Sequence, residues 1–142
     1  MRPLVLKRAA ATRKVFRKKT FDLEFWTDAT GVDNRNVQCG NLRSDDDWIL
    51  DALYNEPLRL RSYVANKLWL DVHTPYYQTA APEARAGADV QYVEVFLNGA
   101  YNSIYNLSEQ VDRKQLQLEK FGDGDHGELY KGVGWGATTF GT

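Results

Sequence analysis

The sequence contains very few of the residues that build metal centres and disulfides. Its 142 residues include one cysteine, Cys39, and two histidines, His73 and His126. A single thiol cannot form an intrachain disulfide, and the two histidines lack HExxH or HxH spacing. We therefore expect Cys39 to be a small core residue, and we expect neither a metal site in this chain nor metallohydrolase chemistry.

Long apolar runs are also missing. No stretch approaches the roughly 18 to 20 residues that span a bilayer, and no apolar signal-peptide core follows the N-terminal charges. The composition, with 43% hydrophobic and 26% charged residues, is typical of a globular protein. We expect a single domain over residues 1–142, without a membrane span and without a signal peptide in this chain.

Motifs for several enzyme classes are absent or incomplete. No GxSxG elbow marks a nucleophile, so hydrolase chemistry has no support. Residues 132–137 match GxGxxG/A, but the sequence leaves no room for the helix that a dinucleotide site needs, and a Gly-rich turn is the simpler interpretation. Residues 123–128 bring acidic side chains together without the spacing of a calcium loop, which predicts a solvated turn.

Positive charge is concentrated at the N-terminus. Residues 1–19 hold eight of the 18 Lys and Arg residues and no acid, so this segment is +8 and the remainder, with ten basic and 19 acidic residues, is −9. Such a segment can contact phosphates, or form a solvated face that balances the acidic remainder. No RNP-like motif, zinc finger or helix-turn-helix spacing accompanies it, so we expect no nucleic-acid partner.

The clearest signal that is present is a β-hairpin. Two alternating runs flank Asn98-Gly99, the strongest short hairpin turn that can be recognised in a sequence. Large side chains on both faces predict that this hairpin is central in a sheet. A two-residue turn fixes the register, and the expected pairs are Phe96 with Tyr101, Tyr92 with Tyr105, Val93 with Ile104 and Leu97 with Ala100.

Other segments complete an antiparallel sheet. Residues 19–26 alternate, and the strand period places Lys19 on the apolar face and Lys18 on the opposite one. Short apolar runs at residues 3–6, 48–53 and 128–133 are further candidates for strands, while residues 112–120 fit either a helix or a strand. The expected apolar face of the 19–26 strand comprises Phe21, Leu23 and Phe25.

One main helix is predicted over residues 57–72 and is expected to pack on the sheet, which makes the fold α+β. Arg61 falls inside the apolar stripe of this helix, where a charge needs a partner. That partner is either an acid such as Asp47 or Glu109, or a bound phosphate, and the residues alone leave both alternatives open. The stripe, expected to face the core, consists of Leu60, Val64, Ala65, Leu68 and Val72.

Several strings along the chain resemble the CotH kinase family, named for spore coat protein H. The most specific is the hairpin followed by Glu109, which is similar to the family's pattern of a vEvfLNG strand, a tight turn and a second strand that ends in glutamate. Further similar strings are FRKKTFDLEF at 16–25, DWIL at 47–50, ANKL at 65–68, YVEVFLNGAY at 92–101, IYNLSE at 104–109 and GELYK at 127–131.

The resemblance implies an atypical protein kinase with a diverged kinase-like fold, of which this chain is the N-terminal lobe. Family members are secreted or surface-associated, and some are thought to be inactive coat or adhesion proteins. The implied ligands are ATP with Mg²⁺ or Mn²⁺, and the implied partner is a protein substrate or a coat or surface protein. By this analogy Lys19 contacts phosphate, Arg61 contacts phosphate or a carboxylate, and the chain near Glu109 lies near the adenine, as a kinase hinge does.

The sequence also departs from the family pattern. Arg8-Ala9 and Arg61-Ser62 stand where the family commonly has Arg-Gly and Arg-Asn. The later Asp-rich segment, thought to hold the catalytic and metal-binding aspartates, has no counterpart before Thr142. We therefore assign no catalytic residue and expect a nucleotide-binding portion without kinase activity of its own. The alternative is a non-catalytic, pseudokinase-like structural or interaction module of a spore coat or cell surface.

Overall fold

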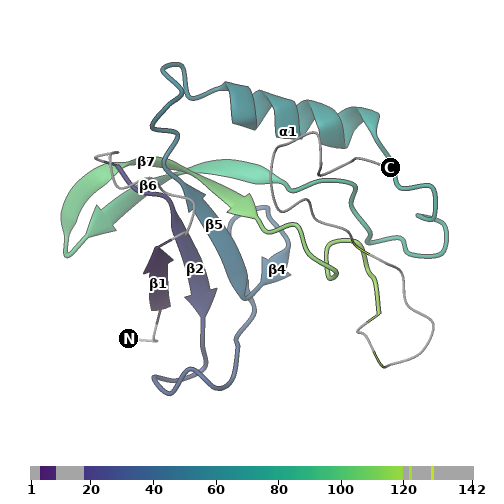
Figure 1. Cartoon of the computed structure of the whole chain (residues 1–142), viewed down its shortest axis with the longest axis horizontal. Helices are drawn as coiled ribbons and strands as arrows, with labels where there is room; N and C mark the ends of the chain where they lie inside the picture. Colours follow the sequence, from purple (N-terminus) through teal and green to yellow (C-terminus); the bar gives the residue numbers. More distant parts are fainter. Residues whose placement is uncertain (1–3, 9–17, 120–121, 123–128, 130–142) are drawn as a thin grey trace, which may run out of the picture.

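The computed structural model describes residues 4–8, 18–119, 122 and 129, and in this part of the chain it is an α+β fold with a mostly antiparallel sheet and a single helix (Figure 1). The expected Gly-rich turn at 132–137, the acidic turn at 123–128 and most of the 128–133 strand candidate lie outside the described residues. The elements are β1 (Leu4–Arg8), β2 (Phe21–Phe25), β3 (Val37–Gln38), β4 (Ser44–Asp45), β5 (Asp47–Asp51), α1 (Arg61–Val72), β6 (Val90–Leu97) and β7 (Ala100–Glu109).

Five of the strands form one sheet in the order β1-β2-β5-β7-β6, and all its neighbouring strands are antiparallel. One face of this sheet carries the apolar core, because every second residue of β2, β5 and β7 is apolar and points the same way. The segment that contains β3 and β4 adds to this core with Leu42 and Cys39. The buried centre consists of Leu42, Trp48, Leu50, Ala52, Tyr105 and Leu107.

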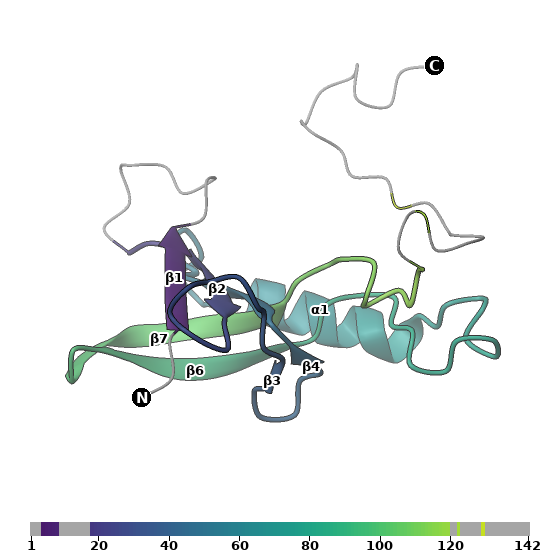
Figure 2. The same ribbon diagram turned by 90° about the horizontal axis from the view of Figure 1, so that it is seen from below.

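Helix α1 lies alongside β6 and β7 in both views (Figures 1 and 2). It begins at Arg61, four residues later than predicted, and no side chain caps its N-terminus. Tyr63 stacks on Tyr92 of β6 with ring centroids 4.7 Å apart, and Trp69 Nε1 donates a hydrogen bond to the Ala86 carbonyl at 3.1 Å. These contacts attach the helix to the face of the sheet opposite the apolar core.

The predicted buried stripe of the helix is wrong. Leu60, Val64, Leu68 and Val72 are all exposed, and no residue of α1 is buried. Arg61 is exposed as well, so it does not need the buried partner that the stripe required. The helical period correctly groups these side chains on one side of α1, but it contains no information about whether that side faces the sheet.

The register of the hairpin follows the prediction only near its turn. Phe96 pairs with Tyr101 and Leu97 with Ala100, but a β-bulge at Val95/Phe96 leaves Asn102 as an extra residue on β7. Beyond the bulge Val93 pairs with Tyr105 and Tyr92 with Asn106, so the predicted Tyr92/Tyr105 and Val93/Ile104 pairs are wrong. The shift of one residue turns Tyr105 into the core, where it is buried.

The hairpin is not central either, because β6 is the last strand of the described sheet. Its large side chains are explained by local contacts instead of a position inside the sheet. Tyr92 stacks on Tyr63 of α1, and Phe96 packs edge-to-face on Tyr101 beside the turn. Residues 112–119 are neither helix nor strand and form turns, in which the Gln115 N–H donates a hydrogen bond to Asp112 Oδ1 at 2.9 Å.

Gly99→Val is expected to lower the free energy of unfolding by about 1 to 2 kcal/mol. Asn98 and Gly99, which join β6 to β7, have φ values of 51° and 81°, which a β-branched side chain resists. No atom lies within 4 Å of a Cβ placed on Gly99, so the expected cost comes from the backbone alone. Urea unfolding measures it, with Gly99→Asn as a control that tolerates positive φ. Equal midpoints for Gly99→Val and the wild type would contradict the prediction.

Candidate functional site

A groove of about 590 Å³ lies beside the C-terminal end of β7 on the face of the sheet that also carries α1. Asp22, Ile49 and Ser108 line it from three neighbouring strands, because the ladder places these residues directly opposite one another on one face. Asn66 contributes from α1, and Val111 lines the groove just beyond β7. The lining is therefore mixed, with apolar walls and a few polar groups, as is usual for small-molecule sites.

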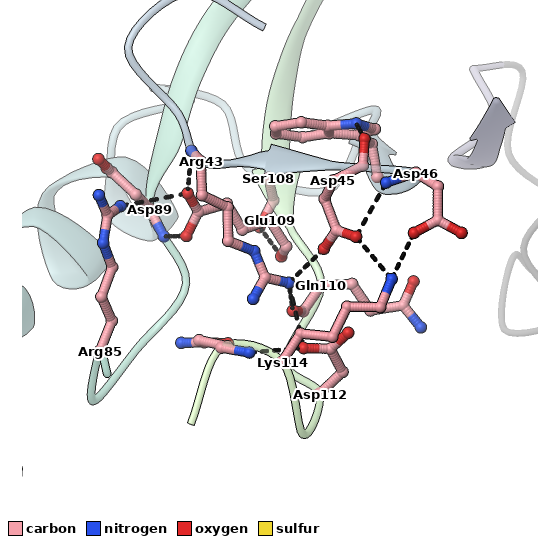
Figure 3. Close-up of polar contacts among 12 residues, drawn as sticks. Arg43, Asp45, Asp46, Arg85, Asp89, Ser108, Glu109, Gln110, Asp112 and Lys114 are labelled. Atoms are coloured by element: carbon pink, nitrogen blue, oxygen red, sulfur yellow. Dashed lines mark hydrogen bonds and ion pairs between the residues drawn. The ribbon is translucent and has the colours of Figure 1, made fainter. Parts of the chain in front are cut away.

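Glu109, at the end of β7, is held by a set of hydrogen bonds on the core side of the same region (Figure 3). Its side chain is buried, with the residue only 1% exposed. Oε1 accepts hydrogen bonds from the Arg43 N–H at 2.8 Å and from Arg85 Nη1 at 3.2 Å, and Oε2 accepts one from the Asp89 N–H at 3.0 Å. These bonds compensate the burial of the carboxylate and fix the chain where it borders the groove.

Two further buried carboxylates, Asp45 and Asp46, share one lysine (Figure 3). Lys114 Nζ donates to Asp45 Oδ1 at 2.8 Å and to Asp46 Oδ1, and Arg43 Nη2 bridges Asp45 Oδ2 at 2.5 Å and Asp112 Oδ1 at 3.1 Å. Burial alone would raise the pKa of Asp46, but its hydrogen bonds, led by that from Lys114, outweigh burial and hold this pKa below its usual value.

The geometry of this charged cluster indicates a structural role. Burial opposes the charged form of Lys114, yet its bonds to the two aspartates dominate and raise its pKa above the usual value. Within the described residues, no group of three or more His, Cys, Asp or Glu side chains is arranged to hold a metal ion. The cluster therefore joins the β4–β5 region to the segment after β7 by pairing each carboxylate with a cation.

A second cavity, of about 330 Å³, lies on the core side of the hairpin, and both Lys18 and Lys19 line it. Lys18 Nζ donates hydrogen bonds to the Ala52 carbonyl at 2.7 Å and to the Ile104 carbonyl, and it lies 3.9 Å from the centroid of the Tyr105 ring. The expectation that Lys18 faces away from the core is wrong, because β2 begins only at Phe21 and the strand period does not extend to Lys18.

Lys18 is expected to make stability depend on alkaline pH. Burial, with repulsion from Arg59, lowers its pKa from 10.5 in the unfolded chain to about 8 in the folded protein. Below pH 8 both states are protonated and the cost of burying the charge opposes folding in full. As the pH rises from 8 to 10.5 the folded protein loses a proton that the unfolded chain keeps, so stability increases.

The measurement is urea unfolding of the wild type and of Lys18→Met between pH 7 and pH 10.5. The free energy of unfolding of the wild type should rise relative to that of Lys18→Met across this range, since all other titrating groups are common to both proteins. The neutral amine still has two N–H groups for the two carbonyls. A difference between the proteins that is constant, or that falls with pH, would contradict the lowered pKa.

The structure separates the three residues for which the sequence predicted ligand contacts. Lys19 lines the cavity at the hairpin and Glu109 lines the groove, while Arg61 is exposed at the start of α1 and lines neither. Glu109 is paired with Arg85, which the sequence reasoning did not single out. Arg43 and Lys114 were missed in the same way, because Arg43 binds Glu109 and Lys114 binds Asp45 across about 70 residues of sequence and no local pattern marks these contacts.

The described residues form an α+β fold with a groove of about 590 Å³ that is lined by its helix and its sheet. A family model described as CotH kinase protein matches residues 8–137. The chain therefore belongs to the CotH kinase family, as the sequence motifs predicted. Comparisons with curated proteins and with solved structures found no match. In the described part of the chain, no helix has the length and apolar character needed to cross a membrane.

Proposed function

We propose that this chain is the nucleotide-binding portion of a CotH-type kinase domain and resembles a kinase N-terminal lobe. The observation that carries this proposal is the groove that ends at Glu109, the residue expected near adenine. Its volume of about 590 Å³ is in the range of small-molecule sites. Ile49 and Val111 provide apolar walls for a base, and Asn66 and Ser108 provide polar groups that can orient it.

The phosphates of ATP would lie outside the described groove, because its charged lining residues, Asp22 and Glu109, are acidic. The family resemblance implies phosphate contacts for Lys19 and Arg61. Because Lys19 lines the cavity on the opposite face of the sheet from the groove, we assign the phosphates of a nucleotide with its base in the groove to Arg61 and test both residues. In protein kinases, by comparison, a strand lysine pairs with a helix glutamate. Here β5 contains no lysine and α1 contains no glutamate, so that pair is not available from these two elements.

Binding of Mg²⁺ or Mn²⁺ would come with the nucleotide, since the described residues supply no cluster of metal ligands. Phosphoryl transfer depends on metal-bound phosphates and on positioned carboxylates. We therefore propose that this chain by itself does not transfer phosphate. Incubation with labelled ATP, either metal and an acceptor protein should give no more incorporation than a Lys19→Ala, Arg61→Ala double variant.

Nucleotide binding itself is tested by melting curves of the chain with and without millimolar ATP and magnesium. A ligand at 100 times its Kd stabilises by about 2.7 kcal/mol, which shifts the Tm of a domain of this size by several degrees. Val111→Glu should reduce the shift by adding a negative charge to the groove, whereas Val32→Glu, outside the groove and also exposed, should not. A wild type without any ATP shift would refute the proposal.

Phosphate contacts are tested separately with Arg61→Met and Lys19→Ala, for which Arg113→Met is the control because it is exposed and lines neither cavity. Since Arg61 is exposed, Arg61→Met should leave the Tm of the free protein near that of the wild type and should abolish the shift caused by ATP. A strong loss of stability without ATP would instead indicate a structural role for Arg61.

A second function is favoured by a different observation. Helix α1 presents an apolar side to solvent, which suits a non-catalytic structural or interaction module of a coat or cell surface. In that case the charged residues near the groove are structural ion pairs only. The melting curves distinguish the two, because an interaction module has no reason to be stabilised by ATP.

A further inference from the structure

The apolar row of helix α1 faces away from the sheet, which is the reverse of the usual arrangement of an amphipathic helix. Side chains of its sheet-facing half are mostly polar or aromatic, and they include Lys67, which forms an ion pair with Asp89. Its outward half carries four apolar side chains in a single row, in which each member follows the previous one by four positions in the sequence. Leu60 at the N-cap is 49% exposed, Val64 53%, Leu68 57% and Val72 70%.

A row with this spacing is the ridge by which helices pack against one another. Exposed apolar residues scattered singly are normal, but a contiguous row along a whole helix marks an interaction surface. Helix α1 lies at one edge of the molecule, so a second helix can approach this side (Figure 1). The partner must be apolar along its contact, and the charges on α1 indicate which partner fits.

The outward half of α1 is self-complementary. Its two charged residues, Arg61 near the start and Asp71 near the end, are both exposed. On a helical wheel with about 100° per residue and Leu60 at the origin, Arg61 lies near 100° and Asp71 near 20°. Both charges therefore lie inside the sector that the apolar row occupies. All six residues are placed symmetrically about position 66, so that an antiparallel copy of α1 matches Leu60 with Val72, Val64 with Leu68 and Arg61 with Asp71.

We propose that the outward face of α1 is a homodimer interface, in which the α1 helices of two copies pack antiparallel about a two-fold axis. Each apolar residue of the row then meets an apolar residue of the partner, and two identical Arg61–Asp71 ion pairs form across the axis. Such self-complementarity is what an isologous interface requires. A parallel arrangement is disfavoured because it would place Arg61 against Arg61 and Asp71 against Asp71.

Sedimentation equilibrium of the full chain without nucleotide tests the proposal. The expected wild-type mass is about twice 16.2 kDa at micromolar concentration. Leu68→Glu should give the monomer mass with an unchanged circular dichroism spectrum, because Leu68 is exposed in the single chain. Val32→Glu, at an exposed apolar position away from α1, should remain dimeric.

Charge reversal then tests the antiparallel pairing. Arg61→Asp and Asp71→Arg should each weaken dimerisation about tenfold or more, because each variant places like charges opposite one another. An equimolar mixture of the two single variants should recover dimers, since both cross-pairs are then complementary. The Arg61→Asp, Asp71→Arg double variant should recover them as well.

Three results would overturn the proposal. A wild type that is monomeric at all concentrations would show that the face binds some other partner or none. A Leu68→Glu variant that dimerises like the wild type would place the interface elsewhere. Single charge variants that fail to recover on mixing would exclude the antiparallel pairing. The nucleotide-binding proposal also uses Arg61, so all of these measurements are made without ATP, and a failure of one proposal can be told apart from a failure of the other.

Discussion

Glu109→Ala is expected to destabilise the fold by about 3 to 5 kcal/mol, because it breaks a buried, fully hydrogen-bonded charge. The carboxylate accepts bonds from the N–H groups of Arg43 and Asp89 and from the Arg85 guanidinium. Its removal leaves two partly buried backbone donors without this acceptor and Arg85 without this counter-ion. Unsatisfied buried donors cost about 1 to 3 kcal/mol each. Glu109 is therefore expected to contribute more to the stability of the fold than an exposed ion pair does.

Urea unfolding of Glu109→Ala, Glu109→Gln and Glu94→Ala measures this effect. Gln keeps one acceptor oxygen but presents an NH₂ group to a donor, so it should lie between the wild type and Ala. Glu94, an exposed glutamate on β6, is the matched control and should change stability by less than about 0.5 kcal/mol. A loss below about 1 kcal/mol for Glu109→Ala would contradict the structural role assigned to its hydrogen bonds.

Trp48→Ala is expected to cost about 3 to 5 kcal/mol, since it removes the largest fully buried side chain of the core. Trp48 is completely inaccessible to solvent and pairs with Leu23 of β2 and with Glu109 of β7 in the ladder. Its Nε1 donates a hydrogen bond to the Asp45 carbonyl at 3.2 Å. Truncation therefore opens a cavity at the point where the core meets the charged cluster.

The stability of Trp48→Ala is measured by circular dichroism during urea unfolding, because the variant loses a tryptophan fluorophore. Trp48→Phe should lose less, since it keeps an aromatic ring in the core and loses mainly the indole hydrogen bond. Val32→Ala, at an exposed position, serves as the control. If Trp48→Ala unfolded at the same urea concentration as Val32→Ala, the assignment of Trp48 to the core would be wrong.

Local sequence patterns predicted the elements of the sheet well. The alternation over residues 19–26 corresponds to β2 (Phe21–Phe25), and the apolar run at 48–53 corresponds to β5 (Asp47–Asp51). The helix was predicted with its correct end at Val72. Each of these features depends on a side-chain period of two or 3.6 residues, which the sequence contains directly.

The site could be predicted only in part. Glu109 was identified through the motif that follows the hairpin, and it lines the groove. Its partners Arg43 and Arg85 could not be found, because they come from loops that only the folded chain brings to the end of β7. Lys18 was placed on the wrong side because the strand period was extended past the start of β2.

The sequence by itself determined the family, the α+β class and the residues that can share a face of each element. Only the tertiary structure decided which of those faces are buried. The bulge at Asn102 reverses the side-chain parity of β7 and turns Tyr105 into the core, although the alternation on either side of the bulge looks regular. The row from Leu60 to Val72 faces outward because the contacts of Tyr63, Lys67 and Trp69 attach the other sides of α1 to the protein. A period fixes relative directions along one element, whereas burial depends on contacts between elements that are distant in the chain.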